Sequence, residues 1–441
     1  MPEVLTRQPQ IPDETEPYVA NARAEPIKAD QFTAPRQLLV FQITARLNSV
    51  SKAAAAMNMS QPAVTQAIAR LEKLAGATLF DRRQTGCYLT PAGGIFQIRV
   101  DRLIAQIGNA LCSPQAGVAG AGKAGATRLW RLTAAQIRGL IAIAECSSFV
   151  EAASLLGISK ASLRRTNREL ESQQQHALFE HTASGPALTM AGREMARSFK
   201  LASSEIDYAI EEIALARGEA AARIRIGVLP QAPILTLTAA LKGLADCYPG
   251  LRVTISEGPY NRLLADLRSG QIDILFGVLR RPDWADDVRE EVLLRDPYVV
   301  AARRGHPLSR KRHVAIEDLA NFDWVVPEAG TPRRRAFDEL FESLAVRPMV
   351  AVETSSPTIQ QAIIATSDRL TLIPRREVSL DQSFCPLIAL RVVSKLVRRP
   401  DGIATRADWH PTIVQQRFLA LLRACAHAPE PTAFEKQVNG G

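Results

Sequence analysis

Apolar residues recur at helical spacing in the first clear pattern along the chain. An apolar helix face begins at Leu38 and Phe41 and continues through Ile43 to Leu47. A short alanine-rich segment, KAAAAMN, follows, and Ser51 precedes it as a capping residue. The pattern predicts a helix and then a second, shorter helix.

The next segment predicts a helix with one apolar and one polar face. A tight turn at Asn58 and Met59 leads to Ser60, which can cap the helix, and Pro62 lies in its first turn, where a missing N–H costs nothing. The inward positions are Val64, Ile68 and Leu71. The outward positions are Gln61, Thr65, Gln66 and Arg70. This order of helices around a tight turn predicts a helix-turn-helix.

A basic hairpin is expected directly after that helix. The segment LFDRRQTGCYLT places Arg82 and Arg83 ahead of a glycine turn, which predicts two short strands forming a wing. Thr90 then caps a further helix. Residues 35–111 are therefore predicted to form one winged helix-turn-helix unit.

The same pattern returns 99 residues later without a gap. Ala53-Ala54 aligns with Ala152-Ala153, and Ser60 aligns with Ser159. The segment LTPAG, which begins at Leu89, aligns with LTMAG. An ungapped match over about 60 residues predicts one fold unit written twice, with the second copy at 129–194.

The outward side chains of the first copy suit DNA. A helix fits the major groove, where Gln and Thr side chains read base edges, while Lys and Arg neutralise phosphates. Nine Lys and Arg against three Asp and Glu give residues 36–106 a charge of +6, and Arg36 lies close to the unit's start. The alternative interpretation is that these side chains form an ordinary polar surface and a solvated loop without a role in DNA binding. The residues predicted to contact DNA are Lys52, Ser60, Gln61, Pro62, Thr65, Gln66, Arg70, Arg82 and Arg83, with Lys160, Arg164 and Arg165 in the second copy.

These motifs resemble a known family. The stretch FQITARLNSVSKAAAAMNMSQPAVTQAIARLEKLAGATLFDRRQTGCYLTPAG resembles the DNA-binding domain of LysR-type transcriptional regulators over its whole length. The resemblance extends over about residues 36–425, except that the family normally carries one DNA-binding unit.

The second copy departs from the first where contact with DNA matters. Gln61-Pro62 becomes Lys160-Ala161, and the arginine pair of the wing becomes His181-Thr182. Arginines nevertheless appear on the helix that corresponds to the DNA-reading helix of the first copy, Arg168 among them. Two interpretations stay open: a second DNA reader with other preferences, or a structural remnant that supports the following helix and the dimer contact.

The helix after the second copy carries an apolar stripe. Its positions, at steps of three and four residues, are Met195, Phe199, Ala202, Ile206, Ile210 and Ile213. The stripe either packs on its own domain or pairs with a partner chain. The resemblance implies a dimerising linker helix, placed at 195–220, and a homodimer or homotetramer on a pseudo-palindromic DNA site.

Strands and helices alternate in the last two hundred residues, which favours an α/β domain with a parallel sheet. The strand segments are RIRIGVL, RVTIS, IDILFGV, WVVP, VAVET and RLTLIP. They form two halves joined by crossing segments, which predicts a two-lobed clamp over 221–425. The domain resembles the family's effector domain, which is similar to type 2 periplasmic binding proteins. Within the family, VVPEAGTPRRRAFDELF and VETSS resemble the branch of a galactose-binding-protein regulator, which responds to sugars.

A small-molecule site is expected where the two lobes face each other. Helix N-termini there present free N–H groups, and hydroxyls and one guanidinium add donors. Ordinary helix capping explains the Ser and Thr residues equally well, and Arg333 is equally one of three surface arginines. The predicted effector residues are Gln231, Ala232, Pro233, Gly277, Thr331, Arg333, Thr354, Ser355 and Ser356.

Composition limits the remaining possibilities. The 441 residues are enough for about three domains, and the net charge of +9 and pI of about 9.4 favour an acidic partner. The six cysteines are isolated, so no metal site or redox pair is expected. We predict a polar disordered tail at 1–34, a Gly/Ala-rich flexible linker at 112–128 and a flexible tail at 426–441. We expect neither a signal peptide nor a membrane span.

The sequence thus predicts a cytoplasmic, ligand-responsive transcription regulator that senses a sugar or a small organic acid. The resemblance also implies contact with RNA polymerase. A solute-binding protein without a transcriptional role is the alternative. An enzyme is the second rival, but none of the six histidines lies in a recognisable catalytic motif, so we expect no enzymatic activity, cofactor or metal.

Overall fold

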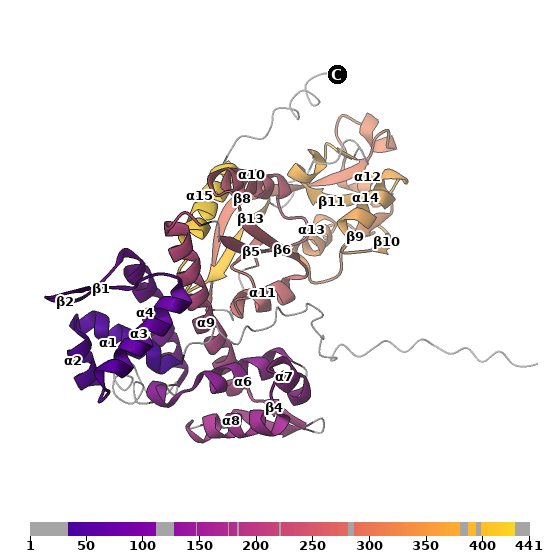
Figure 1. The fold of residues 1–441 in the computed structure, drawn as a ribbon. Helices are drawn as coiled ribbons and strands as arrows, with labels where there is room; N and C mark the ends of the chain where they lie inside the picture. The colour runs from indigo at the N-terminus through magenta and orange to yellow at the C-terminus, as the bar shows by residue number, and fades with distance from the viewer. Residues whose placement is uncertain are drawn as a thin grey trace, which may run out of the picture. The chain divides into compact units, whose positions relative to one another are not determined.

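The computed structural model describes residues 34–111, 128–146, 148–174, 176–182, 185–219, 222–280, 286–379, 387–393 and 398–427 (Figure 1). The predicted tails and the Gly/Ala-rich linker lie outside these residues, apart from one or two positions at their edges. The chain divides into two compact units. One unit combines the residues up to Leu74 with Val100–Ser203, and the other combines Ala75–Arg99 with the residues from Ser204 onward.

The first helix-turn-helix copy has the predicted order of elements. Val64, Ile68 and Leu71 have no exposed surface, as their spacing predicts. The short second helix begins earlier than expected, because the Ser49 hydroxyl, and not that of Ser51, accepts the N–H that caps it. The elements are α1 (Pro35–Leu47), α2 (Val50–Ala56), α3 (Gln61–Ala75), β1 (Phe80–Arg83), β2 (Gly86–Leu89) and α4 (Pro91–Leu111).

The second copy repeats this order. Ser148 and Ser159 cap its second and third helices as Ser49 and Ser60 do in the first copy. Its hairpin pairs Phe179 with Leu188, as the first hairpin pairs Phe80 with Leu89. The elements are α6 (Ala134–Glu145), α7 (Phe149–Leu155), α8 (Lys160–Ser172), β3 (Phe179–Thr182), β4 (Gly185–Leu188) and α9 (Met190–Ala216).

The repeated Leu-Thr-x-Ala-Gly sequence has the same geometry in both copies. The Thr90 hydroxyl donates to the Thr78 carbonyl at 2.7 Å and accepts the Gly93 N–H at 3.0 Å. Thr189 makes the equivalent bonds at 2.8 and 3.1 Å. A Cβ at Gly93 would lie 2.1 Å from the Leu79 carbonyl oxygen, so only glycine fits this approach of helix to backbone. The motif therefore joins the hairpin to the helix that follows it.

Helix α9 starts at Met190, before the predicted linker-helix boundary at 195. Most of its apolar stripe, including Phe199, Ala202 and Ile213, is buried in the single chain. The interpretation in which the stripe packs within its own chain accounts for this burial without a partner chain.

The effector part of the second unit contains a mixed sheet. Within the described residues the strand order is β11-β8-β13-β7-β5-β6, and β12 also pairs with β8. The pairs β5–β6 and β5–β7 are parallel, as predicted, whereas β13 and β8 run antiparallel to their neighbours. The strands are β5 (Arg223–Val228), β6 (Arg252–Glu257), β7 (Ile274–Val278), β8 (Val288–Arg303), β11 (Thr371–Pro374), β12 (Leu387–Ala389) and β13 (Arg398–Arg406).

Two hydrophobic cores define two lobes. The first lies around Ile224, Phe276 and Phe418, and the second around Trp324 and Phe341. The long strand β8 contributes Leu293 to the first core and Tyr298 to the second, so it runs from one lobe to the other (Figure 1). The remaining elements are α10 (Ile234–Cys247), α11 (Tyr260–Arg268) and α15 (Ile413–His427) in the first lobe, and α12 (Ile316–Ala320), β9 (Trp324–Val326), α13 (Pro332–Leu340), β10 (Val350–Glu353), α14 (Pro357–Ala365) and the short 3-10 helices η3 (Pro307–Arg310) and η4 (Arg375–Ser379) associated with the second.

Candidate nucleic-acid interface and effector site

The outer face of α3 is a polar, largely solvent-exposed surface. Gln61, Pro62, Gln66 and Arg70 are exposed, and Thr65 is half-buried. Lys52 is exposed at the start of α2, while the hydroxyl of Ser60 accepts the Ala63 N–H at 3.3 Å. The predicted base-reading side chains are therefore accessible, whereas Ser60 has a structural role as a cap.

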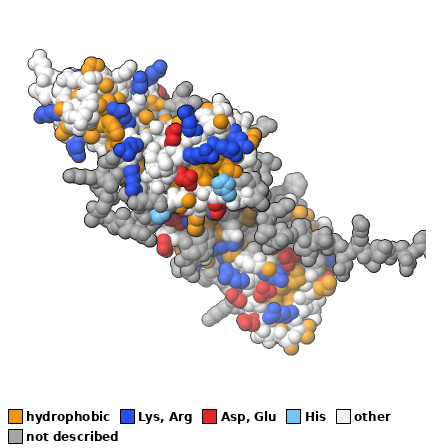
Figure 2. Space-filling view, turned by 90° about the horizontal axis from the view of Figure 1, so that it is seen from below, with side chains coloured by type: hydrophobic (Ala, Val, Ile, Leu, Met, Phe, Trp, Pro, Cys, Tyr) orange, Lys and Arg blue, Asp and Glu red, His pale blue; other side chains and the backbone are white. Residues whose placement is uncertain are grey.

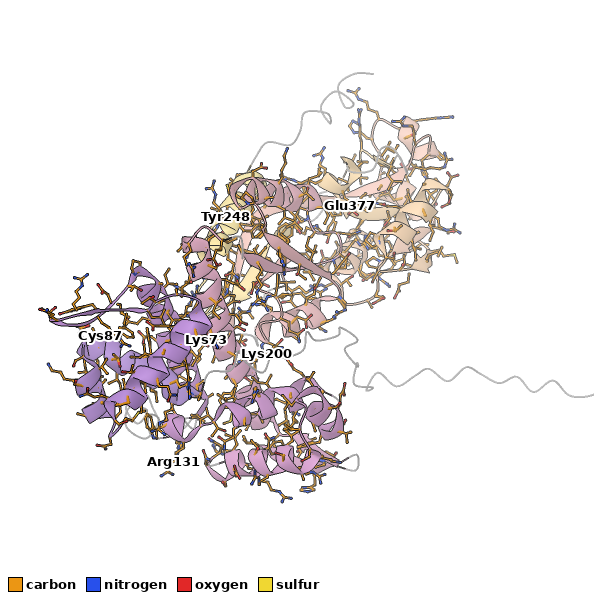
Figure 3. All side chains as sticks on the ribbon, viewed as in Figure 1. Lys73, Cys87, Arg131, Lys200, Tyr248 and Glu377 are labelled. Atoms are coloured by element: carbon orange, nitrogen blue, oxygen red, sulfur yellow. The ribbon has the colours of Figure 1, made fainter. Side chains whose placement is uncertain are left out.

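The β1–β2 hairpin carries the predicted arginines in solvent. Arg82 and Arg83 are both exposed, and Arg83 Nε lies 2.7 Å from an oxygen of Asp81. Cys87, labelled in Figure 3, is buried on the opposite strand and pairs in register with Arg82. Such exposed guanidiniums suit contact with phosphates, and an exposed ion pair like that of Arg83 opposes this only weakly.

Arg36, the basic residue close to the start of the first copy, has a different environment. It is exposed, but its guanidinium carbon lies 4.3 Å from the centre of the Trp130 ring. This cation–π contact joins α1 to the start of the second copy.

The second copy presents a more basic helix. Lys160, Arg164 and Arg165 are exposed on α8, and Arg165 lies 4.0 Å from Glu169. Figure 2 shows Lys and Arg side chains in blue on the face of the molecule seen from below. The wing of this copy exposes His181 and Thr182 in place of arginines. In the second copy, therefore, the exposed positive charge lies on the helix and not on the wing.

Gln231 and Gln360 connect the two lobes of the effector part. Gln231 follows β5 in the first lobe with a φ of +59°, and Gln360 lies on α14 in the second lobe. Gln231 Nε2 donates to Gln360 Oε1 at 3.3 Å. The structure therefore brings a predicted effector residue to the boundary between the lobes.

Arg333 is buried at the same boundary, with 6% of its surface exposed. Its Nη1 donates to Gln360 Oε1 at 2.6 Å and to the Leu372 carbonyl oxygen at 3.4 Å. Burial lowers the pKa of Arg333 to about 10. Of the three consecutive arginines, this one is not on the surface, whereas Arg334 pairs with Asp338 and Glu353.

The hydroxyls predicted for the effector site act mainly as helix caps. Thr331 accepts the Arg334 N–H at the start of α13, and Ser356 accepts the Ile359 N–H at the start of α14. Thr354 accepts the N–H of Ser356, and Ser355 is exposed. The capping interpretation accounts for their positions.

The other predicted effector residues lie inside the first lobe. Ala232 and Pro233 are buried ahead of α10. Gly277 pairs with Gly402 within the sheet at a φ of +141°, and a Cβ there would lie 2.7 Å from the Leu229 Cβ. A close approach between strand and loop explains Gly277 without a ligand.

Sequence reasoning missed the polar residues that surround Arg333 and Gln231. Arg399 on β13 donates to the Gln231 carbonyl oxygen and pairs with Asp401 at 2.8 Å, both side chains being buried. Glu377 on η4, labelled in Figure 3, belongs to the same region, and burial raises its pKa to about 7 and that of Asp401 to about 6. The available signal was the charged sequence RRPD at a position where strand β13 enters the sheet. We call Gln231, Arg333, Gln360, Arg399 and Asp401 the lobe-boundary cluster.

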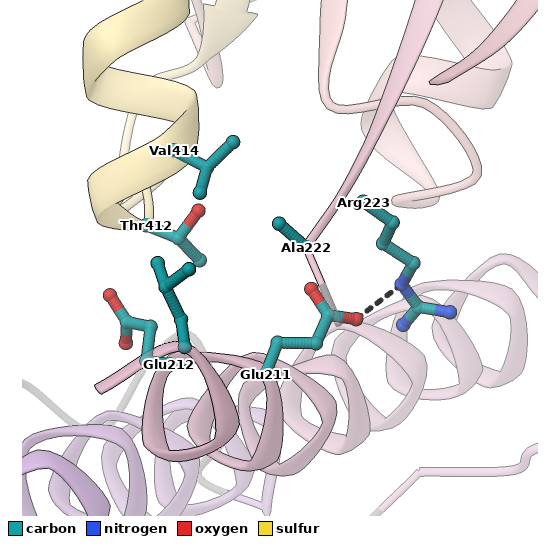
Figure 4. Close-up of a pocket in the computed structure, with 7 residues that line it drawn as sticks. Glu211, Glu212, Ala222, Arg223, Thr412 and Val414 are labelled. Atoms are coloured by element: carbon teal, nitrogen blue, oxygen red, sulfur yellow. Dashed lines mark ion pairs between the residues drawn. The ribbon is translucent and has the colours of Figure 1, made fainter. Parts of the chain in front are cut away.

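A separate small pocket lies elsewhere in the second unit (Figure 4). Its lining comes from the end of α9, the start of β5 and the region around the start of α15, and Glu211 forms an ion pair there with Arg223. None of the predicted effector residues lines it.

Metal sites and membrane spans are both absent from the described residues. No group of His, Cys, Asp and Glu within them has the arrangement of a metal site. None of their helices is both long enough and apolar enough to cross a membrane.

Comparison with known families matches three ranges of the chain. The family described as "Bacterial regulatory helix-turn-helix protein, lysR family" matches residues 35–94 and 134–193. The description "LysR substrate binding domain" matches residues 217–426. Together these ranges cover well over half of the chain. The chain belongs to the LysR-type family of transcriptional regulators.

Relatives of this LysR-type regulator support the assignment. The transcriptional regulator GalR of Pseudomonas putida is 28% identical over 391 residues, which are 88% of this chain and 95% of GalR. The part of this chain outside that alignment is shorter than either helix-turn-helix match, so the alignment reaches both copies. PcaQ of Agrobacterium fabrum is 23% identical over 297 residues, 67% of this chain and 96% of PcaQ.

Solved structures of the family are also similar. A full-length OxyR variant from Pseudomonas aeruginosa is 19% identical, covers 68% of this chain and 96% of its own, and has a TM-score of 0.49.

Members of this family are ligand-responsive transcription regulators, and this LysR-type regulator has both of the parts involved. The regulator binds DNA, for which the family uses a helix-turn-helix, and its α/β domain binds the small-molecule effector. The family also forms oligomers. The resemblance recognised in the sequence is confirmed, and the individual contact residues stay predictions.

Proposed function

We propose that α3 and the β1–β2 wing read the operator, and that the effector binds at the lobe-boundary cluster. The exposed amides of α3 face base edges, and Arg82 and Lys52 contact phosphates. The regulator acts in the cytoplasm, where its DNA lies, and has no catalytic activity of its own.

The observation that carries the effector site is the contact between Gln231 and Gln360 across the two lobes. Arg333 and Arg399 place two buried guanidiniums beside this contact, with Asp401 nearby. Guanidiniums and carboxylates together can hold hydroxyls or a carboxylate, so a sugar or a small organic acid fits this chemistry. A ligand that binds one arrangement of the lobes more tightly shifts the population towards that arrangement.

Mobility-shift titrations on the protein's own upstream DNA test the DNA contacts. Arg82→Ala should weaken binding to all sequences and lower the slope of log affinity against log salt by about 1, because one phosphate contact is lost. Gln66→Ala should instead change the preferred base at one position. Arg312→Ala, an exposed arginine of the second lobe, is the charge-matched control. If Arg82→Ala behaves like this control, the wing does not contact DNA.

Thermal-shift screening with sugars and small organic acids tests the effector site. A compound that binds the folded state raises Tm in proportion to the logarithm of its concentration. A solute-binding protein without a transcriptional role would show this shift but no sequence-selective DNA binding, so the two assays separate the alternatives.

A further inference from the structure

Helices α4 and α9 are the two copies of one helix, and both bury the same face. Most buried apolar positions of α4 have a buried counterpart 99 residues later on α9. The pairs are Phe96 and Met195, Val100 and Phe199, Leu103 and Ala202, and Ile107 and Ile206. In the described part of the chain, neither face depends on a second chain for its burial.

A buried arginine joins the two helices within the second unit. Arg99 on α4 has 1% of its side chain exposed, and its Nη1 lies 3.0 Å from an oxygen of Glu205 on α9. Its Nε lies 2.8 Å from an oxygen of Glu212, which is about two helical turns beyond Glu205 on α9. Arg99 also donates to the His410 carbonyl oxygen at 2.8 Å. This guanidinium is thus held by two carboxylates of the opposite helix.

These contacts fit an antiparallel pairing of the two helices. Arg99 precedes Leu103 along α4, whereas Glu205 follows Ala202, the counterpart of Leu103, along α9. The N-terminal half of α4 therefore meets the C-terminal half of α9. This is the arrangement of two antiparallel copies of one helix.

The ion pairs favour pairing of unlike helices. The counterpart of Arg99 on α9 is Ser198, and the counterpart of Glu205 on α4 is Gln106. In the same register, two α4 helices would place Arg99 against Gln106, and two α9 helices would place Glu205 against Ser198. Either arrangement buries charges without their partners, which is strongly unfavourable. An α4–α9 pair is therefore selected over pairs of like helices.

The ends of the Gly/Ala-rich segment favour pairing within one chain. Leu111 is the last residue of α4, and its carbonyl oxygen accepts a hydrogen bond from Arg128 Nη1 at 2.7 Å. The chain on either side of residues 112–127 is thus in direct contact. A short tether gives an effective concentration in the millimolar range, which an unlinked second chain seldom reaches.

The two helices that would face DNA differ at matched positions. Gln61 corresponds to Lys160, and Gln66 corresponds to Arg165. Thr65 corresponds to Arg164. Gln side chains pair best with adenine, and Arg and Lys side chains pair best with guanine. The half-site of α3 should therefore be richer in adenine contacts and that of α8 in guanine contacts.

We propose that the α4–α9 pair of a single chain stands in place of a dimer contact, so that one chain occupies two DNA half-sites of different sequence. The proposal rests on DNA reading by α3, which is part of the proposed function. It also makes α8 a second reader and not only a structural remnant.

Footprinting of the full chain with paired variants tests the second reader. Gln61→Ala with Gln66→Ala should remove protection of one half-site, and Arg164→Ala with Arg165→Ala should remove protection of the other, each weakening binding by about tenfold or more. Arg310→Ala with Arg312→Ala, two exposed arginines of the effector part, is the control for lost charge. If the α8 variant protects DNA as the control does, the inference fails while DNA reading by α3 stands. If the α3 variant has no effect, the proposed function fails instead.

Sedimentation of the wild-type protein on its footprinted DNA measures the number of chains per protected half-site without any substitution. The complex should contain half as many chains as protected half-sites, whatever the number of chains brought together by the effector parts. Equal numbers of chains and half-sites would overturn the inference.

Discussion

At the scale of single residues, Arg333, Arg334 and Arg335 have three different environments although they are adjacent in sequence. Arg333 is buried against Gln360, Arg334 pairs with two carboxylates, and Arg335 is exposed. Helical geometry turns successive side chains by about 100°. A run of charges therefore does not show by itself which member faces the interior.

Arg333→Leu should abolish the rise in Tm that an effector produces, because the buried guanidinium is lost from the lobe boundary. Arg335→Leu removes the same charge from the exposed neighbour and should keep the full response. Differential scanning fluorimetry of both variants, with and without the compound found by screening, makes the comparison. An unchanged response in Arg333→Leu would place the effector elsewhere.

Glu211 should make stability depend on pH. Burial raises its pKa from an ordinary 4.5 to about 7, more than the nearby Arg223 guanidinium lowers it. The folded state therefore keeps a proton that the unfolded state releases, and its contribution to stability, complete below pH 4.5, is lost as pH rises towards 7.

Glu211→Gln should remove this dependence. Urea unfolding at several pH values should show wild type losing up to about 3 kcal/mol relative to the variant across that window. Parallel curves for the two proteins would show that Glu211 titrates normally.

At the scale of elements, the repeated caps explain why Leu-Thr-x-Ala-Gly persists in both copies. The threonine satisfies two backbone groups, and the glycine lets the helix approach the strand. Each part of the motif has a local reason, so it is retained whether or not its copy contacts DNA.

Gly93→Ala should destabilise the protein by about 1–3 kcal/mol, because the added methyl group would collide with the Leu79 carbonyl oxygen. Gly94→Ala is the matched control, since a Cβ there meets nothing within 4 Å, and it should be neutral or stabilising by up to about 1 kcal/mol. Chemical unfolding of both variants gives the difference. Equal stabilities would mean that the chain relaxes at Gly93 without cost.

Arg99→Met should destabilise the pair of linker helices by about 3–5 kcal/mol, because it leaves buried carboxylates without the guanidinium that holds them. Adding Glu205→Leu and Glu212→Leu should recover much of that loss, because an apolar contact then replaces the ion pairs. Urea unfolding measured by circular dichroism compares the three proteins. A triple variant less stable than Arg99→Met alone would contradict this account.

At the scale of the whole molecule, the sequence allowed prediction of the family, the duplicated unit and the parallel part of the sheet. Periodicity located α3, and the repeat located α8, since local spacing decides these elements. It did not locate β8 and β13, whose antiparallel pairing depends on contacts far apart in the chain. Gln360 and Arg399 were missed for the same reason, because each acquires its role from Gln231, which is distant in the sequence.

The ion pairs of Arg99 have a consequence for how such a regulator changes over generations. In an assembly of identical subunits, every substitution in a recognition helix appears twice, so both halves of the operator must change in step. Here Gln66 and Arg165 are encoded separately, while Arg99 and Glu205 join the helices α4 and α9 that follow their two copies. With α8 as the proposed second reader, each half of the promoter would be free to change with its own reader, and an asymmetric operator would be inherited with a single gene.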